Sequence, residues 1–381
     1  MPAVLLRPLL LLFLGMLTGA FFPRVYCGWS ASAWLRGDAD TEARLAEELV
    51  AFEAEDDATR ASSRPATDRF TGEWALVTHQ MTALGLAQIC LAHPELKARF
   101  VPTLTKAAIK SWLPEMRDFG THAWGEDAMA SLWSPHGHAY LAYAALAVGM
   151  ARVLDPAFPR DIASQHDLMI GAYIRRLSAS QTGLIETYPG EAYPTDVAAV
   201  AAAIAVHARA TGGDHQRVIN AWAEKVLTVQ IDKASGLVIQ RMSATDGKPH
   251  DAPRGSGTAL GAYFAGFADR KVAALLTQGV LRQEASFLGF GAIREYAPGH
   301  SGKGDVDSGP VLLGVSVSAT GFALAPLRAH GHEDAFTRIY RTVDLFGVPF
   351  DGGSSRRFLT GGAIGNALML ALLTSGPELA P

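Results

Sequence analysis

The chain has 381 residues, of which 49% are apolar and 18% are charged, and its formal net charge is −4. This composition supplies enough apolar side chains for a large core and excludes a largely disordered chain. The Lys and Arg residues are scattered, so the sequence lacks the basic surface typical of nucleic-acid-binding proteins. Only Cys27 and Cys90 are present, which excludes a disulfide framework and a zinc site built from thiolates.

The first 24 residues have the pattern of a targeting segment. Arg7 is followed by an almost unbroken apolar run at 8–22, and Pro23 and Arg24 close it. The run is shorter than the roughly 20 residues of a spanning helix, but counting from Val4 makes an anchor feasible. Small residues at 18–20 offer a cleavage site, and a merely buried helix is a third interpretation. We expect an exported protein, either periplasmic after cleavage of a signal peptide at 1–24 or anchored to the membrane by that segment alone.

Apolar helices alternate with amphipathic helices from residue 70 onward. Six segments are apolar on nearly every face, which is typical of helices buried on all sides, and they begin near Glu73, His138, Asp196, Ser256, Pro310 and Gly362. Amphipathic helices are predicted at 38–57, 94–116, 160–177, 214–229, 270–284 and 333–345. We find no run with the alternation of a β-strand.

This alternation predicts an all-α fold, an (α/α)6 toroid of six inner and six outer helices that forms a single domain at 38–378. An open α-solenoid is the alternative, but its terminal helices would need polar outer faces, which this sequence lacks. In a closed toroid, each loop from an outer helix to the next inner helix opens at the same end. These loops are rich in Gly, Pro, aromatic and charged residues, as functional loops often are, and they lie at 117–138, 182–196, 235–257, 289–310 and 348–362.

The loop at 182–196 carries the densest set of candidate residues. Glu191 and Tyr188 are predicted to be catalytic, and Tyr193 and Asp196 to bind substrate, because two carboxylates and two aromatic rings lie within nine residues. Paired carboxylates suit acid–base work, and aromatic rings suit a sugar or another ring. A plainer alternative is that Asp196 or Thr195 caps the helix that follows.

The loop at 289–310 supplies a second set. Pro310 predicts that an inner helix begins there, which makes Asp307 and Ser308 candidates for its cap. Asp305 is not explained by such a cap. We therefore expect Asp305 and Asp307 to be catalytic candidates and Arg294 to bind substrate.

The loop at 117–138 offers the catalytic candidates Asp127 and His138, with Trp124, Glu126 and His136 as substrate-binding candidates. Two histidines near carboxylates could hold a metal, but their spacing matches no metal signature. The sequence therefore predicts neither a metal nor another cofactor. Capping or packing is the plainer role for both histidines.

Two candidates lie elsewhere. Arg254, in the loop at 235–257, could bind a carboxylate on a substrate, although exposed loop arginines are common. His79 lies two turns inside the first apolar helix, from where it could reach a central cavity. The remaining polar or large residues of the apolar helices are expected to be ordinary core groups, namely Met81, Tyr140, Tyr143 and His207.

Four short stretches resemble the linalool dehydratase-isomerase-like domain group. They are Trp124-Gly-Glu-Asp127, Thr187-Tyr-Pro-Gly-Glu-Ala-Tyr-Pro-Thr-Asp196, Asp305-Val-Asp-Ser-Gly-Pro310 and Gly365-Asn-Ala-Leu368. The resemblance covers about residues 70–375 and implies an (α/α)6 toroid with a central pocket and acid–base chemistry on an allylic alcohol. The founding enzyme's chemistry is associated with a cysteine pair, besides Asp, Tyr and His. This chain departs from that pattern, since Cys27 adjoins the targeting segment and Cys90 falls late in an apolar helix.

Three functions stay open, because toroids of this kind also occur in glycoside hydrolases, polysaccharide lyases and epimerases. A glycan-active hydrolase would use Glu191 as the acid and Asp305 or Asp307 as the base, with aromatic platforms at Trp124, Tyr188 and Tyr193. A lyase or isomerase would transfer protons without hydrolysis, with Tyr188 or His138 as the base and Glu191 or Asp127 as the acid.

An apolar pocket would favour a terpenoid alcohol, whereas Arg254 and Arg294 in the pocket would favour a uronate polysaccharide. The third possibility, a non-catalytic periplasmic binding protein, would place the carboxylates in caps and salt bridges. The expected partner is a small molecule or an oligosaccharide, and the sequence does not predict the oligomeric state.

Overall fold

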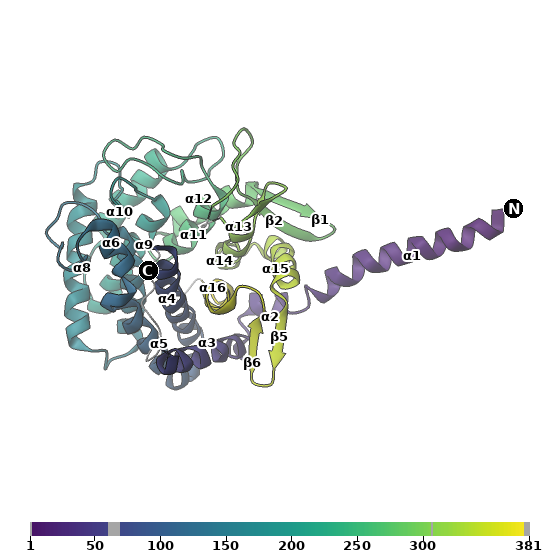
Figure 1. The fold of residues 1–381 in the computed structure, drawn as a ribbon, viewed down its shortest axis with the longest axis horizontal. Coiled ribbons are helices and arrows are strands. Elements are labelled where there is room, and N and C mark those ends of the chain that lie inside the picture. Colours follow the sequence, from purple (N-terminus) through teal and green to yellow (C-terminus); the bar gives the residue numbers. More distant parts are fainter. Residues whose placement is uncertain (1, 60–68, 306–307, 377–381) are drawn as a thin grey trace.

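The computed structural model describes residues 2–59, 69–305 and 308–376 and is mostly helical (Figure 1). Two small antiparallel sheets add to the helices, so the prediction of an all-α chain is wrong in that detail. One sheet has the strand order β1-β2-β4-β3 and the other is a hairpin of β5 and β6. The strands are β1 (Glu284–Phe287), β2 (Phe290–Arg294), β3 (Val311–Leu312), β4 (Val315–Ser316), β5 (Pro349–Gly352) and β6 (Ser355–Phe358).

Five of the six predicted apolar helices form close to their expected positions and are largely buried. They are α4 (Arg69–Ala92), α7 (Ala142–Leu154), α9 (Pro194–Thr211), α11 (Gly255–Ala265) and α16 (Gly362–Leu373). The prediction that the sixth apolar helix begins at Pro310 is wrong. Leu313 and Gly314 both have positive φ, the conformation of a tight hairpin turn, so β3 and β4 form there first. Ser316 then caps α13 (Val317–Phe322), which is followed by α14 (Leu324–Ala329).

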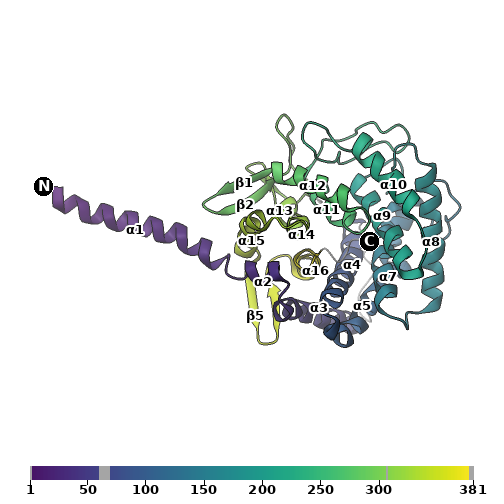
Figure 2. The same cartoon turned by 180° about the vertical axis from the view of Figure 1, so that it is seen from behind.

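The predicted amphipathic helices also form, each with one apolar side against the core. They are α3 (Ala39–Thr59), α5 (Lys97–Trp112), α8 (Arg160–Ala179), α10 (Gln216–Lys225), α12 (Arg270–Arg282) and α15 (Glu333–Gly347). Each contacts one or two apolar helices, as α5 does with α4 and α7, and α8 with α7 and α9. Figure 2 shows α8 and α10 outside α7 and α9.

The apolar helices contact one another in chain order. Contacts run from α4 to α7, α9, α11 and then α13 with α14, and both of these reach α16, which packs on α4. The approach of α16 to α4 is close, because a Cβ on Gly85 would lie 2.5 Å from Leu370 Cγ and 3.0 Å from the Ala371 nitrogen. Gln88 of α4 donates to the Ala371 carbonyl at 2.8 Å and accepts from Tyr263 of α11 at 3.2 Å. The first and last apolar helices are therefore joined by packing and by hydrogen bonds.

The N-terminal apolar helix exists as expected. This helix, α1 (Pro2–Tyr26), projects from the body of the molecule and is followed by the short α2 (Ala31–Arg36) (Figure 1). Two described helical spans are long and apolar enough to cross a membrane, Leu10–Arg36 and Gly72–Ala92. The second span is 78% buried, as expected of a core helix, whereas the first is only 6% buried. Exposed apolar helices near an N-terminus are typical of signal sequences and of membrane anchors.

The close approach of α4 and α16 leads to a first prediction. Replacing Gly85→Ala should lower the free energy of unfolding by roughly 1–3 kcal/mol, because the added methyl meets Leu370 and the α16 backbone. Gly171→Ala, on α8, is the matched control, since its Cβ would meet only the end of Arg175 at 3.5 Å. Chemical denaturation of the full chain in detergent checks both. Equal stability of the two variants would contradict tight packing of α16 on α4.

Candidate functional site

Backbone hydrogen bonds join four of the five predicted loops in chain order. The Ala139 nitrogen donates to the Glu186 carbonyl at 3.1 Å, which links the first loop to the second. Met242 of the third loop donates to Ala192 of the second at 2.9 Å, and Gly255 donates to Glu295 of the fourth at 2.8 Å. The four loops therefore form one continuous surface.

The fifth loop, at 348–362, lies apart from this surface. It forms the β5–β6 hairpin, whose β6 strand packs on α3 and α16. Asp351 pairs with Arg44 of α3 at 3.1 Å. A surface hollow of 410 Å³ lies beside this hairpin, and none of the predicted site residues lines it.

Asp196 is held by side chains from two other segments. Tyr143 of α7 donates to Asp196 Oδ1 at 2.8 Å, and Thr187 of the second loop donates to Oδ2 at 2.6 Å. Tyr193 occupies the cap position of α9 and Pro194 opens the helix, so the prediction that Asp196 or Thr195 caps α9 is wrong. Asp196 instead presents a hydrogen-bonded carboxylate in the first turn of a buried helix.

Aromatic rings pack beside this carboxylate. The rings of Trp124 and His138 lie 4.6 Å apart, and those of Tyr140 and Tyr188 stack at 6.2 Å with an interplanar angle of 3°. Trp124 Nε1 donates to the Thr187 carbonyl at 3.0 Å, which ties this cluster to the Asp196 partner. The sequence-predicted residues Trp124, His138 and Tyr188 are thus brought together in one cluster, which Thr187 links to Asp196.

Burial sets the protonation of this cluster. His138 is 1% exposed, and burial together with the nearby Arg176 lowers its pKa to about 4, so its imidazole is neutral at pH 7. Its Nδ1 atom has no hydrogen-bond partner among the described residues. Burial also raises the pKa of Tyr140 far above its usual range, so this phenol keeps its proton.

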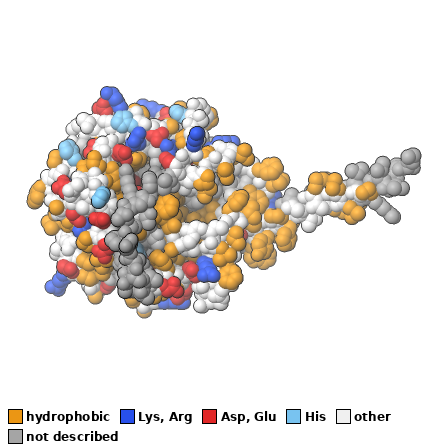
Figure 3. All heavy atoms as spheres, viewed as in Figure 1, with side chains coloured by type: hydrophobic (Ala, Val, Ile, Leu, Met, Phe, Trp, Pro, Cys, Tyr) orange, Lys and Arg blue, Asp and Glu red, His pale blue; other side chains and the backbone are white. Residues whose placement is uncertain are grey.

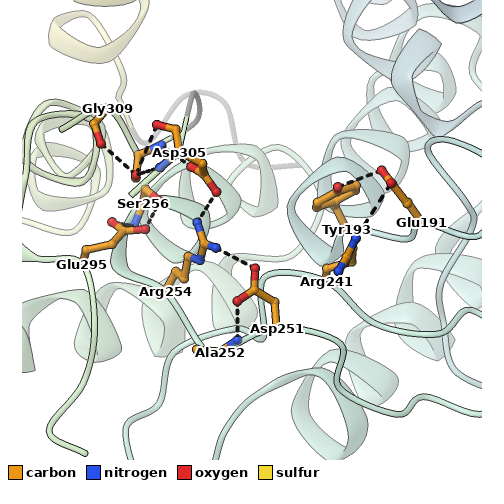
Figure 4. Close-up of polar contacts among 11 residues, drawn as sticks. Glu191, Tyr193, Arg241, Asp251, Ala252, Arg254, Ser256, Glu295, Asp305 and Gly309 are labelled. Carbon is orange, nitrogen blue, oxygen red and sulfur yellow. Dashed lines mark hydrogen bonds and ion pairs between the residues drawn. The ribbon is translucent and has the colours of Figure 1, made fainter. Parts of the chain in front are cut away.

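Glu191 forms a second, more exposed cluster (Figure 4). Tyr193 donates to Glu191 Oε2 at 2.9 Å, and Arg241 Nη1 lies 3.8 Å from Oε1. The Glu191 side chain is 29% exposed. Burial and the neighbouring Glu191 raise the pKa of Tyr193, which keeps this phenol protonated as well.

Arg254 organises a third cluster, drawn beside the second in Figure 4. It donates to Asp305 and, at 2.6 Å, to Asp251 Oδ2, and its guanidinium lies 5.5 Å from the centre of the Tyr296 ring. Burial alone would raise the pKa of Asp305, but hydrogen bonds from Ser308 and Arg254 outweigh it and the pKa is lowered. Asp305 is therefore an ionised, paired carboxylate.

The cap predicted for the fourth loop is wrong. Ser308 is buried, its backbone nitrogen donates to Asp305 Oδ1 at 3.0 Å, and strand β3 rather than a helix follows it. Asp307 lies outside the described residues. Arg294 is exposed at the end of β2, and its side chain donates to the Glu284 carbonyl at 3.5 Å.

The other predicted residues lie away from Asp196. Asp127 accepts from Arg117 Nε at 2.8 Å and from the Met129 nitrogen at 2.7 Å, so it shapes its own loop. Glu126 and His136 are exposed. His79 faces the outer helix α3, where its Nδ1 lies 2.6 Å from Glu53 Oε1.

Sequence reasoning missed several members of these clusters. Tyr143 was expected to be a core residue, yet it is half-buried and bonds to Asp196. The sequence did offer a signal, because Tyr143 is a phenol among small apolar residues. Its helix precedes the apolar helix that was predicted to begin near Asp196. Thr187 was noted only within the resemblance to a family, and nothing local to the sequence pairs Arg241 with Glu191.

Several positions on the apolar helices carry half-buried side chains. These are mainly apolar side chains, and they include Val77, Tyr143, Asp196, Leu260, Phe322 and Leu368. Tyr143 also packs edge-on against Phe264 of α11, with ring centres 5.2 Å apart. The Tyr143–Asp196 pair therefore lies where α7, α9 and α11 approach one another.

Neither cysteine is bonded to the other, and burial raises the pKa of Cys90 to about 11, so it is not a thiolate at neutral pH. Among the described residues, no group of three or more His, Cys, Asp and Glu side chains is arranged to hold a metal ion. Comparisons of the chain with protein-family models and with curated proteins find no match.

Arg254 gives a second prediction. Arg254→Met should lower the free energy of unfolding at pH 7 by roughly 1–2 kcal/mol, since two carboxylates lose their partner while water screens part of the loss. Asp305 has a lowered folded pKa, so its contribution is present above an unfolded pKa near 3.9 and is lost as the pH falls through the folded value. As the pH falls below about 4, the free energy of unfolding should therefore decrease less in the variant than in the wild type.

Unfolding curves at a series of pH values measure this difference. Lys248→Met is the control, because Lys248 pairs with Asp246 at 2.7 Å on the exposed surface and should change nothing. An Arg254→Met variant with the acid sensitivity of the wild type would contradict the role assigned to the Arg254–Asp305 pair.

Proposed function

We propose that this protein is an exported or membrane-anchored acid–base enzyme of the lyase or isomerase class that acts on a small, largely apolar alcohol. The observation that carries the proposal is the Asp196 carboxylate on the mostly apolar helix α9, which accepts from Tyr143 of α7 at 2.8 Å and from Thr187 of the loop before α9 at 2.6 Å. A carboxylate that accepts a hydrogen bond from a protonated phenol is suited to proton transfer. The chemistry is that implied by the resemblance to the linalool dehydratase-isomerase-like group.

The proposed architecture is an (α/α)6 toroid. Support comes from the contacts that lead from α4 through each apolar helix to α16 and back to α4, and from the amphipathic helix that packs outside each of them. Export or anchoring is supported by α1, an apolar helix that the body does not bury. Four hydrogen-bonded loops supply the surface around the proposed pocket.

We place the substrate among the half-buried side chains of the apolar helices. Val77, Leu260, Phe322 and Leu368 are apolar, and Asp196 with Tyr143 supplies the polar group. Ligand pockets are usually of this kind, mostly apolar with a few polar groups that fix orientation. Such surroundings favour a terpenoid-like alcohol over a polysaccharide.

The proposed reaction is an elimination or an allylic shift. A phenol, for which Tyr143 is the candidate, gives its proton to the substrate hydroxyl, which leaves as water when the C–O bond breaks. Asp196 takes a proton from a neighbouring carbon, and the electron pair of that C–H bond forms the new double bond. The hydrogen bond between the two side chains returns the proton from the carboxyl group to the phenolate. In an isomerisation, the carboxyl group instead returns its proton to the carbon, and water adds at the other end of the allylic system and gives a proton to the phenolate.

Hydrolysis of glycans is supported less well. A glycosidase needs one carboxylic acid that stays protonated until it meets the leaving oxygen. Asp305 has a lowered pKa and is paired with Arg254, and Arg241 lies beside Glu191. A hydrolase stays a second candidate because the Glu191 side chain is partly exposed beside Tyr193, an aromatic ring suited to a sugar.

A third prediction tests this assignment. The full chain in detergent should convert one or more small allylic alcohols, and Asp196→Asn should lower the rate by roughly 10²–10⁴-fold, because the variant has no proton acceptor. Tyr143→Phe should lower it as well while leaving the fold intact. Gas chromatography with mass spectrometry measures products and the uptake of deuterium from D2O. Asp214→Asn, at the start of the outer helix α10, is the control that should keep wild-type activity.

Other outcomes would replace the proposal. Release of reducing sugar from oligosaccharides that Glu191→Gln abolishes and Asp196→Asn leaves unchanged would establish the hydrolase instead. Calorimetric binding of an alcohol or a sugar without turnover would indicate a binding protein, for which the ion-paired Asp127 and Asp305 would be structural groups.

A further inference from the structure

The base of α1 is fixed firmly to the body of the protein. Ser30, just after α1, hydrogen-bonds to the Tyr340 hydroxyl of α15 at 2.6 Å. Arg341 of α15 donates to the Gly289 carbonyl in the β1–β2 turn at 2.9 Å. A Cβ on Gly289 would lie 2.7 Å from Arg24 Nε, so this turn lies directly against the last turn of α1. The direction of α1 is therefore tied to α15 and to the β1–β2 hairpin.

Large apolar side chains are exposed around this junction, which we call the base face. Figure 3 shows hydrophobic side chains gathered on the side from which α1 projects. Tyr26 and Trp29 are 68% and 81% exposed, and in the hairpin Phe287 is 77% and Leu288 is 53% exposed. The last turn of α15 adds Leu345 and Phe346. A contiguous exposed apolar surface of this kind usually marks an interaction site.

The backbone of the β1–β2 turn is strained. Leu288 has a φ of +51°, a conformation that is unfavourable for a bulky side chain and that glycine or asparagine ordinarily occupies. Here the turn displays a leucine that is 53% exposed. An exposed apolar side chain on a strained turn agrees with a contact made outside the protein.

The base face also carries positive charge. Arg341 and Arg24 lie close together. Burial is the largest cause that lowers the pKa of Arg341, and repulsion by the Arg24 charge is the second largest. The hydrogen bond that Arg341 makes goes to a backbone carbonyl and not to a carboxylate, whereas the nearby Arg338 is neutralised by Glu284 at 2.6 Å. Cations beside exposed aromatic and aliphatic side chains match the interfacial layer of a membrane that contains anionic lipid.

The length of α1 agrees with this arrangement. The segment from Val4 to Phe22 of this helix is about 28 Å long, which is close to the thickness of a hydrocarbon core of about 30 Å. Arg24 then falls at the level of the lipid headgroups, together with the aromatic rings of Tyr26 and Trp29, the place that such residues favour in membrane proteins.

We propose that the base face binds the headgroup layer of an anionic membrane, so that α1 and the β1–β2 turn together hold the body against the bilayer in one orientation. The occupant is lipid rather than a second copy of the chain, because the face continues from an exposed apolar helix and its charge is positive. This proposal rests on the membrane-anchored form of the proposed function, in which α1 is retained, and not on the reaction catalysed.

Fluorescent labelling of the turn tests the proposal. Leu288→Cys is labelled with an environment-sensitive dye and the full chain is placed in nanodiscs of phosphatidylcholine with phosphatidylglycerol. Cys27 and Cys90 are 4% and 0% exposed, so they should react little. Leu168→Cys on α8 is the matched control, because its 55% exposure equals that of Leu288 within two percentage points. We expect a blue shift and quenching by spin-labelled lipid at Leu288 and neither at Leu168. Phe287→Cys serves as a second site if Leu288→Cys does not fold.

The charge is tested separately. With Arg24→Gln and Arg341→Gln together, the dye at position 288 should lose the difference between nanodiscs with and without phosphatidylglycerol. Identical dye spectra at positions 288 and 168 in nanodiscs would overturn the proposal. A blue shift that grows with protein concentration in detergent without lipid would also overturn it, since that result would assign the base face to a second copy of the chain.

Discussion

The close packing of α16 on α4 is the constraint on which the rest of the structure depends. Without a side chain, Gly85 lets Leu370 and the α16 backbone approach α4, and Gln88 then bonds to Ala371 and, across the apolar helices, to Tyr263. Glycine is the residue that permits such an approach. Because the last apolar helix returns to the first, each of the helices between them keeps two neighbours, and the loops above them are held at fixed spacing.

That fixed spacing explains how Asp196 acquires its partners. Tyr143 reaches it from α7, and Thr187 reaches it from the loop before α9. Three separate segments thus supply one hydrogen-bonded group, and none of them could do so alone. A carboxylate in largely apolar surroundings is costly unless it is hydrogen-bonded, so both donors stabilise this arrangement.

The sequence predicted the alternation of helices well, because burial on all sides and burial on one side leave different patterns of apolar residues. It failed where local backbone conformation decided the outcome. The apolar run after Pro310 has the composition of a buried helix, yet the positive φ of Leu313 and Gly314 makes a hairpin. The strained turn at Leu288 and Gly289 was missed for a related reason, since glycine commonly accepts positive φ but leucine does not.

The candidate site was predicted in part. Loop composition identified Glu191, Asp196, Tyr188 and His138 as chemically notable, but it could not assign their partners, since Tyr143 is 53 positions from Asp196 and Arg254 is 51 from Asp305. Asp305 was singled out because no cap explained it, and the structure gives it Arg254 and Ser308 instead. Pairing of this kind lowers the pKa of a carboxyl group, so that the group is ionised and cannot donate a proton. Buried phenols, in contrast, stay protonated. Asp305 is therefore a poor proton donor for a glycosidase, and the candidates at this site that stay protonated are the tyrosines and the buried Glu295, whose pKa is raised by burial.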